Sequence, residues 1–97
     1  GGYNVYPKEI EQLIDALPGV VESAVIGVPH PDFGEAVMAI VVQEAALSEE
    51  QILSAIASDL ARYKQPKHVT FVEALPRNAM GKVQKNLMRD TYRNVFS

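Results

Sequence analysis

Two segments rich in β-branched residues constrain the fold of this chain most strongly. They are residues 20–28 (VVESAVIGV) and residues 36–43 (AVMAIVVQ), and both have the length of a strand. A shorter segment, residues 68–72 (HVTFV), predicts a third strand. Between the first two segments, residues 29–35 (PHPDFGE) form a turn-rich connection that we expect to be too long for a tight hairpin. The chain is therefore predicted to be built around a small sheet.

Three further segments have helical patterns. In residues 6–17 the apolar side chains recur at i, i+3, i+4 and i+7, with a proline in the first turn and Pro18-Gly19 at the end. Ser48 and Gln51 predict a capping box that opens a second helix, whose core-facing residues are Ile52, Leu53, Ile56 and Leu60. A final short helix is predicted from the apolar face of Leu87, Thr91, Tyr92 and Val95.

These elements follow the order α-β-β-α-β-loop-α, which predicts a small α+β domain with a three-stranded sheet flanked by helices. The 97 residues, of which 47% are hydrophobic, fit a single domain, residues 1–97. The absence of cysteine excludes a disulfide framework, a thiol nucleophile and a cysteine-ligated zinc, and it fits a cytoplasmic protein. No apolar run approaches the roughly 20 residues that cross a membrane. Because the chain opens on Gly-Gly leading straight into a helix, we expect it to be part of a larger protein.

Charge is divided unevenly along the sequence, although the net value is only −3. Residues 1–61 hold one of the nine lysines and arginines and ten of the twelve acidic residues, and residues 62–97 hold the remainder. Either the basic half faces an external anion, or the two halves attract each other across the fold. Nucleic acid is a poor candidate for that anion, because the basic half lacks interleaved aromatic residues and the acidic half repels a duplex.

The residues best suited to chemistry lie in one loop, residues 75–86 (LPRNAMGKVQKN), where Arg77, Lys82 and Lys85 surround Gly81. The loop lacks the G-x-x-x-x-G-K-[ST] spacing of a phosphate-binding P-loop. It can hold one mobile ammonium against a phosphate oxygen or a developing negative charge. Its composition alone favours a solvated basic loop.

The other polar residues favour structural roles. His30 and His68 stand in no metal-ligand spacing, so we expect no metal site and a structural or surface role for each. Glu9 and Glu11 fall in the first turns of a helix, where negative charge on the surface complements the helix dipole. The glycine pair that opens the chain, residues 1–2, lets another group approach the backbone closely, or it is simply a flexible end.

Three longer motifs carry a resemblance to a known family: residues 1–11 (GGYNVYPKEIE), residues 19–35 (GVVESAVIGVPHPDFGE) and residues 63–85 (YKQPKHVTFVEALPRNAMGKVQK). In order and spacing they resemble the C-terminal domain of the adenylate-forming superfamily, which includes acyl-CoA synthetases, the adenylation domains of peptide synthetases and luciferases. The resemblance covers essentially the whole chain. The first and last motifs look most like those of malonyl-CoA synthetases, since Met80 stands directly before Gly-Lys, where many other members carry a small residue.

The resemblance implies one part of an ATP-dependent acid–thiol ligase that forms an acyl-CoA, here malonyl- or methylmalonyl-CoA. A carboxylate attacks ATP to give an acyl-adenylate and pyrophosphate, and coenzyme A then displaces AMP. In the family, the C-terminal domain rotates between these two steps. In the first pose the lysine at the position of Lys82 enters the nucleotide site as a catalytic residue. In the second pose the glycines at Gly1 and Gly2 line the pantetheine tunnel, with Asn4 beside them.

By the same resemblance, ATP, coenzyme A and Mg²⁺ are bound mainly by a large N-terminal domain outside this chain, so we expect the 97 residues alone to be catalytically inert. The implied partners are that N-terminal domain and a small carboxylic acid, with no nucleic acid and no membrane. Enzymes of this kind are often controlled by acetylation of the same lysine. Lys82, and less so Lys85, is therefore a candidate target of a protein lysine acetyltransferase and deacetylase. Two alternatives stay open: a stand-alone module that binds phosphate or nucleic acid, and a domain that serves only as an acetyltransferase substrate.

Overall fold

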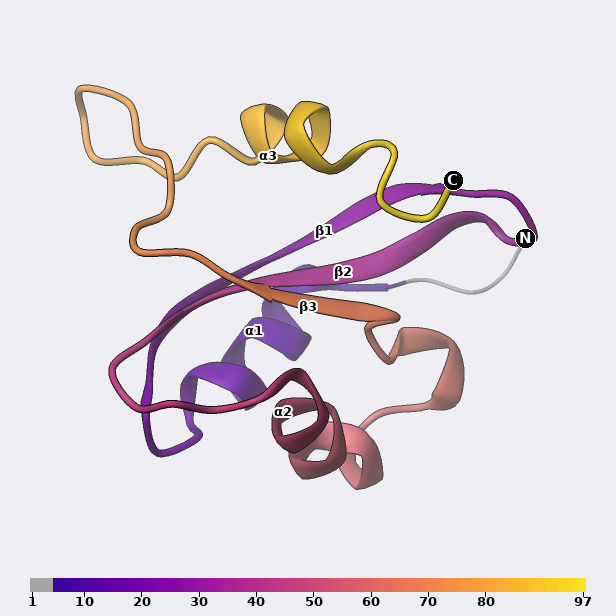
Figure 1. Cartoon of the computed structure of the whole chain (residues 1–97), viewed down its shortest axis with the longest axis horizontal. Helices are drawn as coiled ribbons and strands as arrows, with labels where there is room; N and C mark the ends of the chain where they lie inside the picture. Colours follow the sequence, from indigo (N-terminus) through magenta and orange to yellow (C-terminus); the bar gives the residue numbers. More distant parts are fainter. Residues whose placement is uncertain (1–4) are drawn as a thin grey trace.

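Three strands form one mixed sheet in the computed structural model, which describes residues 5–97 (Figure 1). Strand β1 (Val20–His30) pairs antiparallel with β2 (Gly34–Gln43). Strand β3 (His68–Phe71) pairs in parallel with the other side of β2, so β2 is the central strand. The three-stranded sheet was predicted from the sequence and is confirmed.

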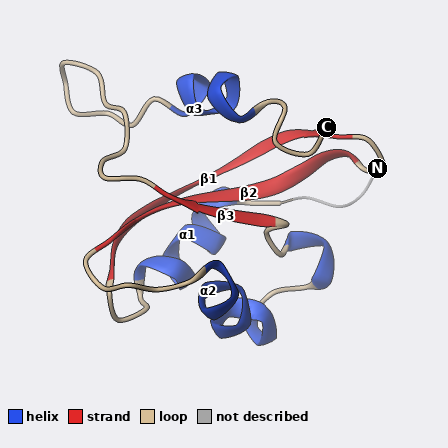
Figure 2. Cartoon of the chain, viewed as in Figure 1, coloured by secondary structure: helices blue, strands red, loops and turns tan. Residues whose placement is uncertain are grey.

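Helices cover both faces of this sheet (Figure 2). Helices α1 (Pro7–Asp15) and α2 (Glu49–Ile56) lie on one face, and α3 (Lys85–Tyr92) lies on the other. Two short 3₁₀ turns, Ala57–Asp59 and Arg62–Lys64, connect α2 to β3. The order of the elements confirms the predicted α+β class.

The connection between β1 and β2 differs from the sequence prediction. Both strands continue through residues that we expected to be loop, until His30 stands opposite Gly34. Only residues 31–33 remain as the turn, so the hairpin is tight and the expectation of a longer connection was wrong. The backbone N–H of Asp32 donates to His30 Nδ1 at 3.0 Å and helps to close the turn. Continuous pairing with the neighbouring strand overrides the weak strand propensity of these residues.

The face of the sheet under α1 and α2 carries the larger core. Side chains of both helices meet alternate residues of the strands there, and the buried set is Ile10, Ile14, Val25, Val37, Ala39, Val41, Ile52, Ile56, Leu60 and Val69. The capping box of α2 is confirmed: Ser48 Oγ accepts the Gln51 N–H at 3.1 Å, and Gln51 Oε1 accepts the Ser48 N–H at 2.8 Å. Since β2 is covered on both faces, its residues 36–42 are all buried.

The opposite face is covered by α3 and by the chain that leads to it. The buried set there is Ala24, Ile26, Val28, Met38, Ile40, Val42, Leu75 and Met88. The helical face predicted for this segment was partly wrong, because Thr91 is exposed and Leu87 and Val95 are 48% and 40% exposed. Met88, which is 3% exposed, takes the core position, with Tyr92 and Phe96 packed beside it. Hydrophobicity alone ranked Leu87 above Met88 and so misplaced the buried side of the helix.

Candidate functional site: a lysine hairpin on the α3 face

Residues 77–83 form a small hairpin that carries Lys82 close to its tip. Its two arms meet in an antiparallel bridge between Arg77 and Val83. The Asn78 N–H donates to the carbonyl oxygen of Lys82 at 2.9 Å, and the Gly81 N–H donates to the carbonyl oxygen of Asn78 at 2.9 Å. In Figure 1 the segment between β3 and α3 projects away from the body of the domain. Lys82 therefore stands on a projecting loop whose backbone is held by hydrogen bonds.

Two residues give this turn its shape. The side-chain oxygen Oδ1 of Asn78 accepts the backbone N–H groups of Met80 and Lys82, both at 2.9 Å, as asparagine does at the start of many turns. Gly81 has a φ of +83°, a conformation that side chains disfavour. A methyl group added at Gly81 would meet no atom within 4 Å, so the backbone angle alone requires glycine there. The sequence prediction named Gly81 but missed Asn78, although an asparagine three residues before a glycine is a recognisable turn pattern.

The ammonium of Lys82 is exposed and forms no ion pair with any residue between positions 5 and 97. Met80, two residues before it, is 92% exposed, the most exposed of the large apolar side chains in the described part of the chain. An unpaired cation and an apolar side chain thus share the tip of one hydrogen-bonded turn. Such a tip is suited to contact a surface that supplies negative charge and apolar area.

Arg77 links the base of the hairpin to the sheet. Its Nη1 donates to the carbonyl oxygen of Gly81 at 2.7 Å, and its Nη2 donates to Oε1 of Glu22 on β1. The guanidinium has several donors in a rigid plane, which lets it hold two acceptors at once. One side chain therefore connects the turn beside Lys82 with the outer strand of the sheet.

Lys85 fastens the other end of the loop, where α3 begins. Its Nζ lies 2.8 Å from Glu11 Oε2, and the same carboxylate oxygen accepts the backbone N–H of Val25 at 2.8 Å. β1 is an edge strand, so Glu11 occupies a backbone donor that would otherwise be free. Glu11 therefore does more than complement the helix dipole, because together with Lys85 it ties α1, β1 and α3.

The uneven charge of the sequence is explained by these contacts. Each of the three ion pairs of lysine or arginine within residues 5–97 joins a basic residue of the second half to a glutamate of the first half. Besides the two pairs described above, Lys64 Nζ lies 3.1 Å from Glu9 Oε1, and this hydrogen bond raises the pKa of Lys64. Attraction between the two halves, one of the two alternatives left open by the sequence, therefore accounts for Lys64, Arg77 and Lys85, whereas Lys82 has no ion-pair partner in the part of the chain that the structure describes.

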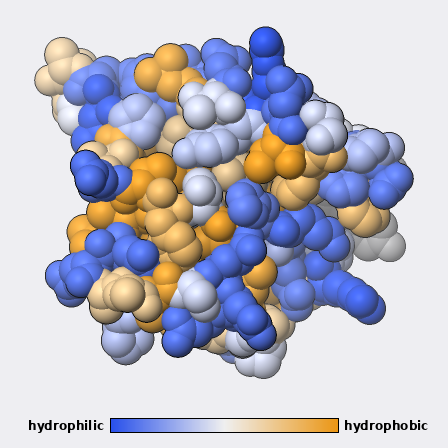
Figure 3. All heavy atoms as spheres, in the orientation of Figure 1, coloured by the Kyte–Doolittle hydropathy of each residue, from blue (hydrophilic) through white to orange (hydrophobic). Residues whose placement is uncertain are grey.

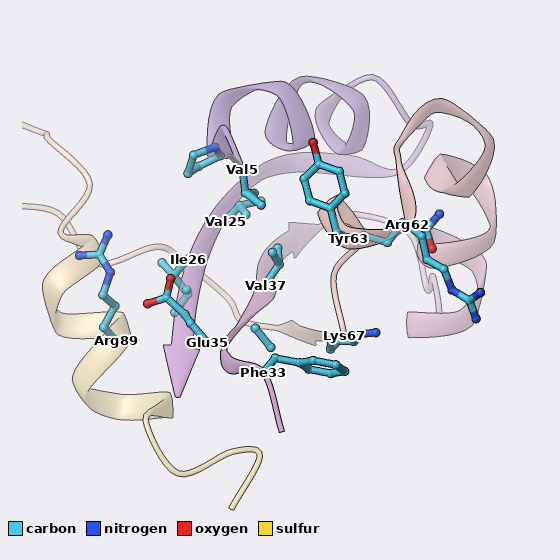
Figure 4. Close-up of a pocket in the computed structure, with 14 residues that line it drawn as sticks. Val5, Val25, Ile26, Phe33, Glu35, Val37, Arg62, Tyr63, Lys67 and Arg89 are labelled. Carbon is cyan, nitrogen blue, oxygen red and sulfur yellow. The ribbon is translucent and has the colours of Figure 1, made fainter. Parts of the chain in front are cut away.

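A second candidate region is an open groove of about 1020 Å³ beside the N-terminal end of α1 (Figure 4). Its apolar floor includes Val25, Ile26 and Val37. In Figure 4, Arg89 from α3 stands at one side of it, and Tyr63, Arg62, Phe33 and Lys67 stand at the other. Figure 3 shows apolar surface over the sheet, between the two helical layers, bordered by hydrophilic side chains. Glu35 also lines the groove, so this concave surface combines apolar and aromatic residues with charged residues of both signs, a composition common in small-molecule sites.

The groove begins at Val5, the first residue that the structure describes. The predicted pantetheine-facing residues Gly1, Gly2 and Asn4 precede it in the chain and lie outside the described residues. The groove was not predicted from the sequence, because its lining comes from five separate segments with no common motif.

The two histidines take part in local packing. His68 Nδ1 lies 2.7 Å from Glu49 Oε2, and the His30 ring lies 4.5 Å from the ring of Phe33 and 5.1 Å from that of Phe96. No group of three His, Asp or Glu side chains within residues 5–97 is placed to hold a metal ion. None of the helices in that range has the length and apolar character needed to cross a bilayer.

Within residues 5–97, this small α+β domain therefore presents Lys82 on a hydrogen-bonded turn without an ion-pair partner, and it has no metal site. The comparison with protein families identifies it further. The chain belongs to the family of AMP-binding enzyme C-terminal domains, whose model matches residues 9–82. The matched range includes Gly81 and ends on Lys82.

Individual relatives agree with this assignment. The chain is 52% identical over 93 residues to the long-chain-fatty-acid–CoA ligase FadD13 of Mycobacterium tuberculosis, which covers 95% of this chain and 18% of that protein. It is 47% identical to a 3-[(3aS,4S,7aS)-7a-methyl-1,5-dioxo-octahydro-1H-inden-4-yl]propanoyl:CoA ligase of Rhodococcus jostii, over 93% of this chain and 18% of that protein. The crystal structure of apo MatB from Rhodopseudomonas palustris matches all of this chain and 20% of MatB, with a TM-score of 0.97 and 61% identity. The chain thus spans about a fifth of the length of these relatives.

Proposed function

We propose that this domain is the C-terminal part of an ATP-dependent acid–thiol ligase that makes an acyl-CoA through an acyl-adenylate. The observation that carries the proposal is the exposed ammonium of Lys82, which has no ion-pair partner within residues 5–97 and stands on a turn held by backbone hydrogen bonds. The family assignment and the CoA ligases among the relatives support it.

In the first half-reaction the carboxylate of the acid attacks the α-phosphate of ATP, which releases pyrophosphate. Both reactants are anions, so their approach is opposed by charge repulsion. Lys82 contacts the carboxylate and phosphate oxygens and stabilises the negative charge as they are brought together. ATP, coenzyme A and Mg²⁺ are bound mainly by the N-terminal domain, and the described residues of this chain contain no metal site of their own.

In the second half-reaction the domain rotates, and the coenzyme A thiol attacks the adenylate to release AMP. Gly1 and Gly2 then line the passage of the pantetheine arm, where a side chain would block the thiol, and Asn4 helps to shape that loop. The groove beside Val5 supports this role, because it places aromatic and basic side chains next to the residue that directly follows Asn4 in the sequence. Rotation of this kind is a gating step that can limit turnover. The 97 residues alone are expected to be inert, and detectable acyl-CoA synthesis by them would contradict the proposal.

We propose malonate or methylmalonate as the acid. The support is the combination of the N-terminal glycine motif with Met80 directly before Gly81-Lys82, a pattern that resembles malonyl-CoA synthetases. The test is thioester formation by the full-length protein with acetate, malonate, methylmalonate and longer acids, each with ATP and coenzyme A. Higher kcat/KM for the two dicarboxylates supports the substrate. Activity confined to long-chain acids contradicts it and leaves the ligase proposal intact.

Reversible acetylation of Lys82 is the regulation that this geometry favours. Acetylation removes the positive charge and with it the contact to the phosphate. Lys82 is exposed and unpaired within residues 5–97, whereas the ammonium of Lys85 is held by Glu11, so Lys82 is the better target of a cytoplasmic acetyltransferase. Mass spectrometry of the purified protein after acetylation tests this: modification at Lys85 in preference to Lys82 would contradict it.

Binding of phosphate or nucleic acid by the basic half as a stand-alone module is the weaker alternative. Lys64, Arg77 and Lys85 are engaged with carboxylates of the acidic half, so they are not free to contact phosphates. Nucleic-acid binding that falls steeply with salt would revive that alternative.

A further inference from the structure

Arg77 stands between the Lys82 turn and the sheet. It donates to the carbonyl oxygen of Gly81, the residue directly before Lys82, at 2.7 Å, and it also donates to Glu22 on β1. Nothing in the chemistry of adenylation requires an arginine at this place, since its guanidinium is already occupied by two acceptors of the domain itself.

The remaining hydrogen bonds of the hairpin are internal. They join Asn78 to residues 80–82 and the carbonyl oxygen of Pro76 to the N–H of Gln84 at 2.9 Å. Internal bonds fix the shape of the turn, but they do not fix its direction relative to the sheet. The links to the sheet are the apolar anchors at its base, buried Leu75 and partly buried Val83, and the contact of Arg77 with Glu22.

We infer that Arg77 is a positioning residue for Lys82: it holds the tip of the hairpin at a fixed angle to β1, so that the lysine enters the nucleotide site in a reproducible position. This inference rests on the proposed role of Lys82. Arg77 touches neither ATP nor the acid and acts through the backbone carbonyl next to the catalytic lysine.

The partial exposure of Arg77 and Glu22 indicates that their ion pair serves to position the loop and adds little to the stability of the domain. The side chains of Arg77 and Glu22 are 42% and 33% exposed, and ion pairs at such places contribute little to stability. Catalysis is far more sensitive to geometry, because a displacement of about 1 Å at a reacting group can lower a rate by about a hundredfold. Loss of Arg77 should therefore leave the domain folded and displace Lys82.

The experiment measures the two half-reactions separately in the full-length protein carrying Arg77→Ala. Adenylation is followed by exchange of labelled pyrophosphate into ATP, and thioester formation is followed from preformed acyl-adenylate and coenzyme A. We expect kcat for adenylation to fall by about tenfold to a hundredfold, with little change in the KM for ATP, in thioester formation or in Tm. Unchanged adenylation, or equal loss in both half-reactions, would overturn the inference.

Two further variants separate positioning from general damage. Glu22→Gln removes the charge of the anchor but leaves the contact of Arg77 with Gly81, so its loss of adenylation should be smaller and equally selective. Arg77→Lys supplies a single ammonium that cannot hold both acceptors in the same plane, and it should restore adenylation only in part. Arg93→Ala, an exposed arginine just past the end of α3, is the matched control and should leave both half-reactions unchanged.

A double variant decides whether Arg77 acts through Lys82. Once Lys82→Ala has removed the ammonium, adding Arg77→Ala should cause no further loss of adenylation, because the two residues work as one unit. Additive losses would overturn the inference. The outcome also separates the two proposals: if Lys82→Ala alone leaves adenylation intact, the proposed function fails, whereas if only Arg77→Ala is without effect, the positioning role fails.

Discussion

The two faces of the sheet are held together in different ways. Under α1 and α2, ten buried apolar residues form a continuous core. On the other face eight residues are buried, but α3 contributes only Met88 to them, and the chain before it is fastened by Arg77 and Lys85 to carboxylates near β1. Burial of apolar area gives stability without direction, while charged hydrogen bonds give direction with little stability. The first face therefore contributes more of the helix packing that keeps the domain folded, and in the inference above the charged contacts of the second face aim the loop.

The largest effect on stability is expected from a large-to-small substitution in the core under α1 and α2. Ile14 is fully buried, so Ile14→Ala leaves a cavity and should lower the free energy of unfolding by about 2–5 kcal/mol. Met88→Ala on the second face should cost about 2 kcal/mol, the low end of that range, because partly exposed Tyr92 and Phe96 can close over the gap. Urea unfolding of the two variants measures the difference, and a larger loss for Met88→Ala would contradict the division between the faces.

Two glycines offer a matched comparison of the turns. Gly81 and Gly34 have similar positive φ angles, +83° and +75°, and an added methyl group meets no atom within 4 Å at either. Gly81→Ala and Gly34→Ala should therefore each cost about 1–2 kcal/mol of stability. Only Gly81→Ala should lower adenylation in the full-length protein, by about tenfold or more, since it displaces the residue next to Lys82. Equal losses of adenylation in the two variants would show that the turn beside Lys82 matters no more for adenylation than the turn between β1 and β2.

A smaller effect is expected at the N-terminus of α2, far from the Lys82 hairpin. Ser48→Ala removes the side chain that accepts the Gln51 N–H and should lower the free energy of unfolding by about 1 kcal/mol. Adenylation at a temperature well below the unfolding transition should not change. A selective loss of adenylation would mean that the first face also directs the loop.

The smallest effect concerns Asp15, which lies near both anchoring carboxylates. Burial raises the pKa of Asp15 above its ordinary value of 3.8, the hydrogen bond from Ser23 opposes this, and the charges of Glu11 and Glu22 add to it. A raised pKa means that the folded state binds the proton more tightly, so this contribution to stability is present at low pH and is lost as pH rises through the folded pKa. Asp15→Asn removes the titration. The stability of the wild type relative to Asp15→Asn should therefore fall as pH rises from about 3 to about 7, and a rise would contradict the assignment.

Much of the fold follows from local sequence patterns, and the parts that did not follow depend on distant contacts. The spacing of Ile10 and Ile14 and the capping box of Ser48 were sufficient to predict α1 and α2, because each pattern lies within one element. The tight β1–β2 turn and the buried side of α3 were missed, since strand pairing decides the first and the packing of Met88 against the sheet decides the second.

At the site, too, contacts between residues distant in the sequence were not predicted. The resemblance to the adenylate-forming superfamily singled out Lys82, whereas the composition of its loop alone favoured a solvated basic loop. The sequence did not identify Arg77 as an anchor, because its partner Glu22 lies 55 positions away in the sequence. The charge division between the two halves was the only indication of such pairs, and it did not say which residues meet.

The role of Lys82 in the first half-reaction is tested most directly by Lys82→Ala in the full-length protein, with the two half-reactions measured separately. Loss of one group that stabilises developing charge should lower adenylation by about a hundredfold to a thousandfold. Thioester formation from preformed acyl-adenylate should stay within about twofold of wild type, because in the proposed rotated pose Lys82 is turned away from the active site. Equal loss in both half-reactions, or adenylation at the wild-type rate, would contradict the assignment of Lys82 to the nucleotide site.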